Sequence, residues 1–148
     1  MTESQPLIIE RIFDAPRELV YAAWTQNEHM KVWSCPESFV ITFGDMDVRP
    51  GGKWHAGMKG PDGIELKLGG EYLEVIPNEH LKYTHAWEEA DGTPGTQMLV
   101  TVDFDDVDGK TEMTFTQTGF DSIESRDGHE GGWSQSFDKL TAYLIEKR

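Results

Sequence analysis

The order of two hydrophobic periods constrains the fold of this chain more than any other feature. From residue 38 to residue 118, apolar and polar side chains alternate in segments separated by turn sequences, which is typical of antiparallel strands with one buried face. The period then becomes helical, with a single apolar stripe of Trp133, Phe137, Leu140 and Leu144. One long helix is available to cover one face of the sheet. The pattern therefore predicts an α+β fold in which a curved antiparallel sheet wraps around the C-terminal helix.

The N-terminal part of the chain adds a strand and two short helices to this plan. Residues 6–13 are rich in β-branched side chains and predict the first strand. Asp14 is expected to cap the helix that follows, and residues 27–33 predict a second short helix with Asn27 as its cap. The predicted order is one strand, two short helices, six strands and a helix over about 125–147. A strongly curved sheet that grips one helix leaves a space between them.

Three local patterns make the strand region more specific. Gly69-Gly70, inside a long predicted strand, is expected to mark a bulge or bend. Asp108-Gly109 stands between two alternating segments and predicts a hairpin turn. The first alternating segment has large apolar side chains at every second position: Phe39, Ile41 and Phe43.

Length and charge exclude several classes of protein. With 148 residues, the chain is expected to form a single domain over residues 1–148. It has 27 acidic and 13 basic residues and a net charge of −14, a field that repels phosphate backbones, so we expect no binding to nucleic acid. The start of the chain has no basic region followed by an apolar segment, and no stretch approaches the roughly 20 apolar residues of a membrane span. We therefore expect a cytoplasmic protein without membrane insertion.

Motifs for catalysis and metal binding are not found in the sequence. The five histidines form no HExxH pair, and Cys35 has no second cysteine with which to bind a metal or form a disulfide. The segment DFDDVDG fails the EF-hand pattern, because valine and aspartate stand at its fifth and sixth positions. No GxSxG is present. We expect no metal, no cofactor and no catalytic residue.

Strand parity identifies the candidates for a ligand-binding site. Alternate side chains of a strand point to the same face of the sheet. One alternating set is large and mostly apolar, whereas the other set carries Lys53, Lys82 and Glu88. The apolar set is therefore expected to face the covering helix. Trp33 and Trp133 are expected near the mouth of the space, and His85 is a candidate polar anchor. The predicted ligand-binding residues are Trp33, Trp54, Met58, Tyr72, Tyr83, His85, Trp87, Phe115, Gln117, Trp133 and Phe137. A solid aromatic core is the alternative interpretation, and for His85 the alternative is a core histidine with a satisfied hydrogen bond.

Four segments carry a resemblance to a known family: RIFDAPRELVYAAWTQNEHMKVW, DVRPGGKWHAGMKGPDG, GGEYLEVIPNEHLKYTHAW and GGWSQSFDKLTAYL. Over roughly residues 8–146 the chain resembles stand-alone bacterial relatives of the C-terminal domain of the activator of Hsp90 ATPase. These belong to the START-like, helix-grip (SRPBCC) superfamily, with lipid-transfer domains, polyketide cyclases and pollen allergens of the birch type. The resemblance implies a deep, mainly apolar cavity between the sheet and the C-terminal helix. It implies no single activity.

Three functions follow from these observations and the resemblance. The first is a protein that binds an apolar small molecule, such as a lipid or an aromatic, polyketide-like compound. The second is a chaperone-linked or stress-response protein with a protein partner such as an Hsp90-type chaperone. The full eukaryotic co-chaperone has an additional N-terminal domain for which this chain has no room, so we expect little activation of Hsp90. The third is a cyclase-like or hydrolase-like enzyme, which needs an acid/base pair that His85 alone does not provide.

Overall fold

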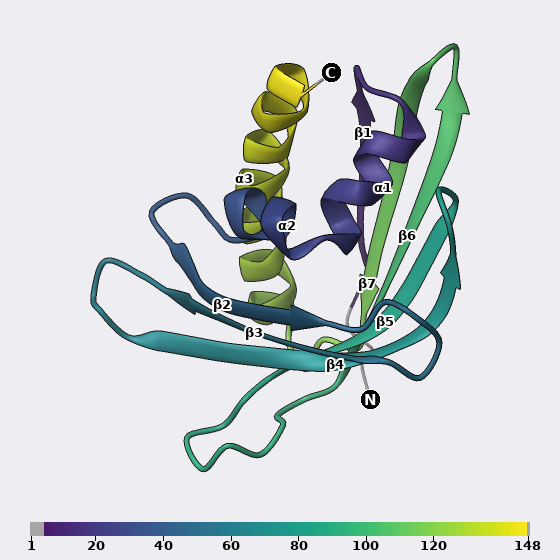
Figure 1. Cartoon of the computed structure of the whole chain (residues 1–148). Coiled ribbons are helices and arrows are strands. Elements are labelled where there is room, and N and C mark those ends of the chain that lie inside the picture. The colour runs from purple at the N-terminus through teal and green to yellow at the C-terminus, as the bar shows by residue number, and fades with distance from the viewer. Residues whose placement is uncertain (1–4, 148) are drawn as a thin grey trace.

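A seven-stranded sheet curves around the helices of the protein, and its strand order is β1-β7-β6-β5-β4-β3-β2 (Figure 1). The computed structural model describes residues 5–147. The strands are β1 (Leu7–Phe13), β2 (Val40–Met46), β3 (Lys53–Lys59), β4 (Glu65–Ile76), β5 (His80–Trp87), β6 (Met98–Val107) and β7 (Lys110–Thr118). The helices are α1 (Arg17–Thr25), α2 (Asn27–Trp33) and α3 (Ile123–Lys147). Every neighbouring pair of strands is antiparallel, which confirms the predicted α+β fold and its element order.

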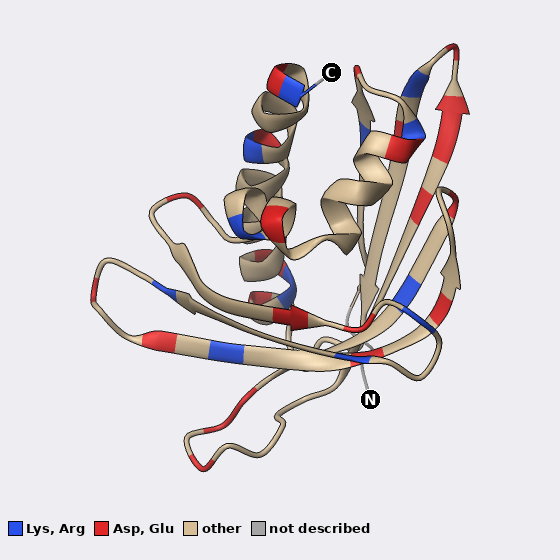
Figure 2. Ribbon diagram, in the orientation of Figure 1, with Lys and Arg blue, Asp and Glu red and all other residues tan. Residues whose placement is uncertain are grey.

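The sheet bends so that its two halves hold the helices on one side. Figure 1 shows β2, β3 and β4 running beneath the helices, while β6, β7 and β1 rise beside them. The long helix α3 and the short pair α1 and α2 share the concave side of the sheet. Figure 2 shows acidic residues in the loop between β5 and β6 and at the β6–β7 end of the sheet. None of the helices between residues 5 and 147 is both long and apolar enough to cross a bilayer.

The two short helices begin without the side-chain caps that the sequence predicted. Pro16 is the N-cap residue of α1, and its carbonyl oxygen accepts the amide protons of Leu19 and Val20. Gln26 is the N-cap residue of α2, and neither of these two N-cap side chains makes a capping hydrogen bond. The prediction that Asp14 and Asn27 are the N-cap residues was therefore wrong. Pro16 is still extended, with φ −69° and ψ 154°, and the helix begins at Arg17, so Asp14 lies two residues before the N-cap.

The glycine pair in β4 does not mark the register shift. The bulge between β4 and β5 lies between Tyr72 and Glu74, beyond the pair. Gly69 and Gly70 keep regular pairing with β3, so the predicted bulge at these residues was wrong. Their lack of side chains instead permits close approach: a Cβ on Gly70 would lie 1.9 Å from the carbonyl oxygen of Thr84.

A bulge in β2 interrupts the predicted alternation of Phe39, Ile41 and Phe43. The register with β3 shifts between Ile41 and Phe43, so Ile41 pairs with inward Met58, while Phe43 pairs with outward Gly57. The Phe43 ring covers that glycine, because a Cβ on Gly57 would lie 2.5 Å from the ring. The alternation of the segment therefore breaks after Ile41, since one extra residue reverses every following side chain.

The hairpin and the C-terminal helix are as predicted. Asp108 and Gly109 have φ values of 54° and 84°, the left-handed conformations that a tight two-residue turn between β6 and β7 requires. In α3, the side chains of Phe137, Leu140 and Leu144 are at most 1% exposed. The apolar stripe of the sequence is thus the face that α3 packs into the core.

Candidate functional site

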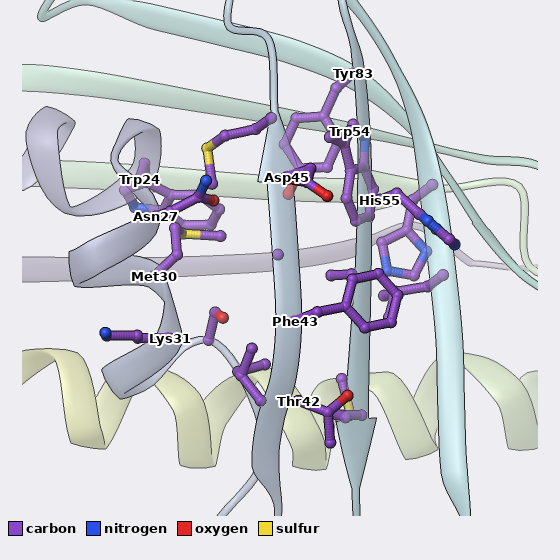
Figure 3. Close-up of a pocket in the computed structure, with 18 of the residues that line it drawn as sticks. Trp24, Asn27, Met30, Lys31, Thr42, Phe43, Asp45, Trp54, His55 and Tyr83 are labelled. Atoms are coloured by element: carbon purple, nitrogen blue, oxygen red, sulfur yellow. The ribbon is translucent and has the colours of Figure 1, made fainter.

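The most enclosed cavity, called the main cavity below, lies between the two short helices and the inner face of β2 to β5, and it extends to Trp133 of α3. Its volume is about 310 Å³. Figure 3 shows side chains of α1 and α2 and those of β2 and β3 around it. Its buried lining residues are Trp24, Met58, Leu68, Tyr72, Leu81, Tyr83 and His85. Its exposed lining residues include Asn27, Glu28, Lys31, Thr42, Asp45 and His55. The cavity thus has an apolar interior and a polar rim.

Trp54 forms the centre of the aromatic wall. Its Nε1 donates to the carbonyl oxygen of Thr84 at 3.1 Å, while the amide of Glu71 donates to Oγ1 of Thr84 at 2.8 Å. Gly70 pairs with Trp54 across the sheet and gives the indole room to reach this carbonyl. The indole meets the Tyr83 ring edge to face, with centroids 5.6 Å apart. The Trp54 side chain of β3 therefore donates a hydrogen bond to the backbone of β5, and this bond holds the aromatic wall in place.

His85 is a neutral polar group within this aromatic wall. The residue is 3% exposed, and its Nδ1 has no hydrogen-bond partner among the described residues. Burial, together with a smaller effect of His129, lowers the pKa of His85 to about 3, so the imidazole is uncharged at neutral pH. Its ring lies 5.7 Å from the rings of both Trp54 and Trp87. The interpretation of a core histidine with a satisfied hydrogen bond is wrong for Nδ1.

A second cavity, of about 360 Å³, adjoins the first. Trp87 of β5 and His129 of α3 line this second cavity and not the first. The side chains that line both cavities are Ser34, Met58, Leu68, His85 and Trp133. Met58 and Leu68 are buried and apolar, so the two spaces are separated by a wall of flexible side chains and aromatic rings.

Both ring nitrogens of His129 are engaged. Nδ1 lies 2.7 Å from the carbonyl oxygen of Ser125, which only accepts, so Nδ1 carries the proton. Nε2 is then the acceptor of the Trp87 Nε1 proton at 3.0 Å. His129 is therefore not free to act as a general base toward His85. Within residues 5–147, no group of three or more His, Cys, Asp or Glu side chains is arranged to hold a metal ion.

Trp133 links the cavities to the buried core. Its Nε1 donates to Oε1 of Gln117 at 2.8 Å. Its ring lies 4.6 Å from the ring of Phe115 and stacks on Trp24 at 6.0 Å. These contacts hold one large ring between the core and the two spaces.

The whole arrangement agrees with one protein family. The family described as activator of Hsp90 ATPase homolog 1-like protein matches residues 14–145 of the chain. The chain belongs to this family. The match includes α1, α2, all but the last two residues of α3 and every strand except β1. A search of curated proteins finds no match to the chain.

Solved structures of bacterial proteins share the fold of this family member. A protein from Chromobacterium violaceum is 28% identical with a TM-score of 0.85, and the match covers 94% of this chain and 96% of that chain. An AHSA1 protein from Silicibacter pomeroyi is 24% identical with a TM-score of 0.89, over 97% of this chain and 100% of that chain. A protein from Arthrobacter aurescens is 26% identical with a TM-score of 0.86, over 95% and 86%. These similarities establish the helix-grip fold and name no ligand.

The structure brings together seven of the predicted ligand-binding residues of this family member. Those that line the main cavity are Trp54, Met58, Tyr72, Tyr83, His85 and Trp133. Trp87 lines only the second cavity. Strand parity succeeded here because side chains of one parity face the same side of a sheet. Their contact with a ligand stays a prediction.

Phe115 and Phe137 do not line either cavity. Both are completely buried, and their rings meet edge to face with centroids 5.3 Å apart. The stripe of α3 packs directly on β7 at this level and leaves no space between them. The solid-core interpretation is right for these two residues.

Trp33 and Gln117 also lie outside both cavities. The Trp33 indole is completely buried and donates to the carbonyl oxygen of Ala23 at 3.0 Å, so its predicted place at the mouth was wrong. The end of α2 turns this ring toward α1. Gln117 is completely buried, and its amide supports Trp133 rather than the cavity.

Sequence reasoning missed the helical side of the cavity. Trp24 was not among the predicted ligand-binding residues, and the sequence did not indicate that α2 would place Asn27, Met30 and Lys31 along the cavity. The sequence did contain a signal for the buried position of Trp24, because Val20, Ala23 and Trp24 share one apolar face of α1. The position of a seven-residue helix depends on tertiary packing, which its own sequence does not reveal.

Proposed function

We propose that this protein binds a small molecule, a lipid or an aromatic, polyketide-like compound, in its internal cavity. The observation that carries the proposal is the cavity of about 310 Å³ whose buried wall is apolar and whose rim is polar. Small-molecule sites in proteins have volumes of about 300–1,000 Å³ and combine apolar walls with a few polar groups. Apolar area that a ligand buries here contributes roughly 25 cal/mol per Å² before the cost of association.

Native mass spectrometry of protein purified under mild conditions tests this proposal. We expect the intact protein to carry a small molecule that is released on denaturation. Tryptophan fluorescence adds a second readout, because Trp24, Trp54 and Trp133 line the cavity. Titration with flat aromatic and fatty-acyl compounds should give a saturable change in emission.

A pair of charge substitutions on β5 separates cavity binding from surface binding. Tyr83 is 7% exposed and lines the cavity, whereas neighbouring Lys82 has the opposite parity. Tyr83→Glu should abolish the fluorescence response, and Lys82→Glu should preserve it. Circular dichroism establishes whether each variant is folded. Retained binding in folded Tyr83→Glu would contradict the proposal.

A protein partner of the Hsp90 type is the second candidate, and the description of the family is the observation that favours it. It rests on that description alone, whereas ligand binding rests on the geometry of named side chains. Addition of stoichiometric protein to a bacterial Hsp90 provides the test. We expect little change in ATPase rate, and a several-fold stimulation would favour this second candidate.

A further inference from the structure

We propose that the ligand of the main cavity is an uncharged molecule whose apolar skeleton carries hydroxyl or carbonyl oxygen, and not a fatty carboxylate or a cation. This inference rests on the proposed function and defines its ligand more narrowly. Three features of the cavity carry it: its uncharged interior, its acidic rim and two buried nitrogens that have no hydrogen-bond partner within residues 5–147.

The buried wall of the cavity provides no charge to pair with a charged ligand. Burial raises the pKa of both Tyr72 and Tyr83, so both phenols are neutral at neutral pH. His85 is also neutral, because burial lowers its pKa to about 3. A carboxylate or an ammonium group inside this wall would lose its water and gain no opposite charge.

The rim does not favour a carboxylate either. Its charged residues are Glu28, Lys31 and Asp45, two acids against one base, and all three are exposed. His55 also reaches the rim, but its Nε2 is bound to the carboxylate of Glu88. The chain as a whole has a net charge of −14, which adds to the repulsion of anions.

The hydrogen bonds of the tryptophans single out one indole. Four of the five indole N–H groups have acceptors. These pairs are Trp33 with Ala23, Trp54 with Thr84, Trp87 with His129 and Trp133 with Gln117. Trp24 Nε1 alone has no partner among the described residues, although the residue is only 2% exposed. Buried N–H groups are nearly always paired, so this one requires an explanation.

Trp24 and His85 line the same cavity, and Nδ1 of His85 likewise has no hydrogen-bond partner in the described part of the chain. Their rings lie 6.0 and 6.4 Å from the ring of Trp133, which contacts both. An indole N–H only donates, so Trp24 requires an acceptor such as a carbonyl or hydroxyl oxygen. An imidazole Nδ1 donates in one tautomer and accepts in the other, and a hydroxyl group serves either. A small rotation of each ring on binding would bring its nitrogen to the ligand, and such side-chain changes are common.

Four probes with the same ring system test this inference on the unmodified protein. Naphthalene, 2-naphthol, 2-naphthoate and 2-naphthylmethylammonium differ only in the polar group, and calorimetry at pH 7 gives their affinities. We expect 2-naphthol to bind about tenfold more tightly than naphthalene, and both ions to bind at least tenfold more weakly than 2-naphthol. Equal binding of naphthalene and 2-naphthol, or tighter binding of either ion, would overturn the inference and leave the proposed function intact. Failure of all four to bind would overturn both.

Two substitutions test whether the side-chain nitrogens of Trp24 and His85 cause the preference for 2-naphthol over naphthalene. His85→Phe and Trp24→Phe should each reduce the preference for 2-naphthol over naphthalene, by about threefold or more, while naphthalene still binds. His80→Gln is the matched control, because His80 lies on the same strand as His85 but on the opposite face of the sheet. The preference of this variant for 2-naphthol over naphthalene should equal that of the unmodified protein. A preference that survives in both folded Phe variants would overturn the assignment. Variants that do not fold leave the four-probe ranking of the unmodified protein as the deciding result.

Discussion

At the scale of single residues, one missing side chain decides the shape of the aromatic wall. Gly70 faces Trp54 across β3 and β4, and the space above it lets the indole reach the Thr84 carbonyl at 3.1 Å. The sequence shows two adjacent glycines without revealing which non-local contact needs them. A glycine that permits close approach and a glycine that permits a bulge look the same in the sequence.

Gly70→Ala should destabilise the protein by about 3 kcal/mol or more, because the new Cβ would lie 1.9 Å from a backbone oxygen that cannot move alone. Gly131→Ala is the control: it lies within α3, nothing is within 4 Å of its added Cβ, and alanine is the better helix former by about 1 kcal/mol. Urea unfolding of both variants measures the difference. Similar stabilities for the two variants would show that Gly70 is not needed for close approach.

His85 should make the protein sensitive to acid. Its pKa is about 3 in the folded protein and about 6.5 in an unfolded chain, so between these values only the unfolded chain binds the proton. Its contribution to stability is therefore complete above pH 6.5 and falls as the pH falls toward 3. From pH 7 to pH 4.5, the unmodified protein should lose about 2 kcal/mol more stability than His85→Phe, measured by urea unfolding. Equal losses would mean that the folded protein also protonates this ring.

At the scale of elements, one histidine joins three strands of the sheet. His80 begins β5, and its ring nitrogens lie 2.7 Å from carboxylate oxygens of Glu74 in β4 and Asp103 in β6. Partial burial opposes protonation, but hydrogen bonds to Asp103 and Glu74 and their negative charges raise the pKa of His80 above its ordinary value. The protonated ring thus pairs with both neighbouring strands.

This contact should stabilise the sheet most at slightly acidic pH. A raised pKa in the folded state means that the stabilisation is complete below about pH 6.5 and is lost as the pH rises through the folded-state value. His80→Gln should therefore reduce stability by about 0.5–1 kcal/mol at pH 6 and by less at pH 9. Thermal unfolding of both proteins at the two values measures this. A larger effect at pH 9 would contradict the assignment.

The elements themselves were predictable because each has a local signal. Alternation gave the strands, Asp108-Gly109 gave the last hairpin, and the α3 stripe gave the long helix. The predicted alternation breaks between Ile41 and Phe43 because the bulge there depends on pairing with β3, not on β2 alone. Trp33 was misplaced because the neighbouring Ala23 carbonyl, and not the cavity, receives its indole proton. What the sequence did not reveal was decided by contacts between elements.

At the scale of the whole molecule, the cavity arises because the helices cover the concave sheet unevenly. The α3 stripe packs solidly on β7 at Phe115 and Phe137, whereas α1 and α2 enclose the main cavity together with β2 to β5. Trp133 lies between these two regions and lines both cavities. The molecule thus has a solidly packed part around Phe115 and Phe137 and a hollow part, which is the proposed ligand site. The lack of nucleic-acid binding expected from its charge of −14 stays a prediction.

Nuclear Overhauser effects between a bound probe and the methyl groups of the protein test the central claim most directly. Met58 and Leu68 are each 6% exposed and line both cavities, whereas Ile8 and Ile12 of β1 are 53% and 62% exposed and line neither. With methyl-labelled protein and saturating 2-naphthol, we predict cross-peaks from probe protons to the methyl groups of Met58 and Leu68. Cross-peaks only to exposed methyl groups such as those of Ile8 and Ile12 would contradict an internal ligand-binding cavity.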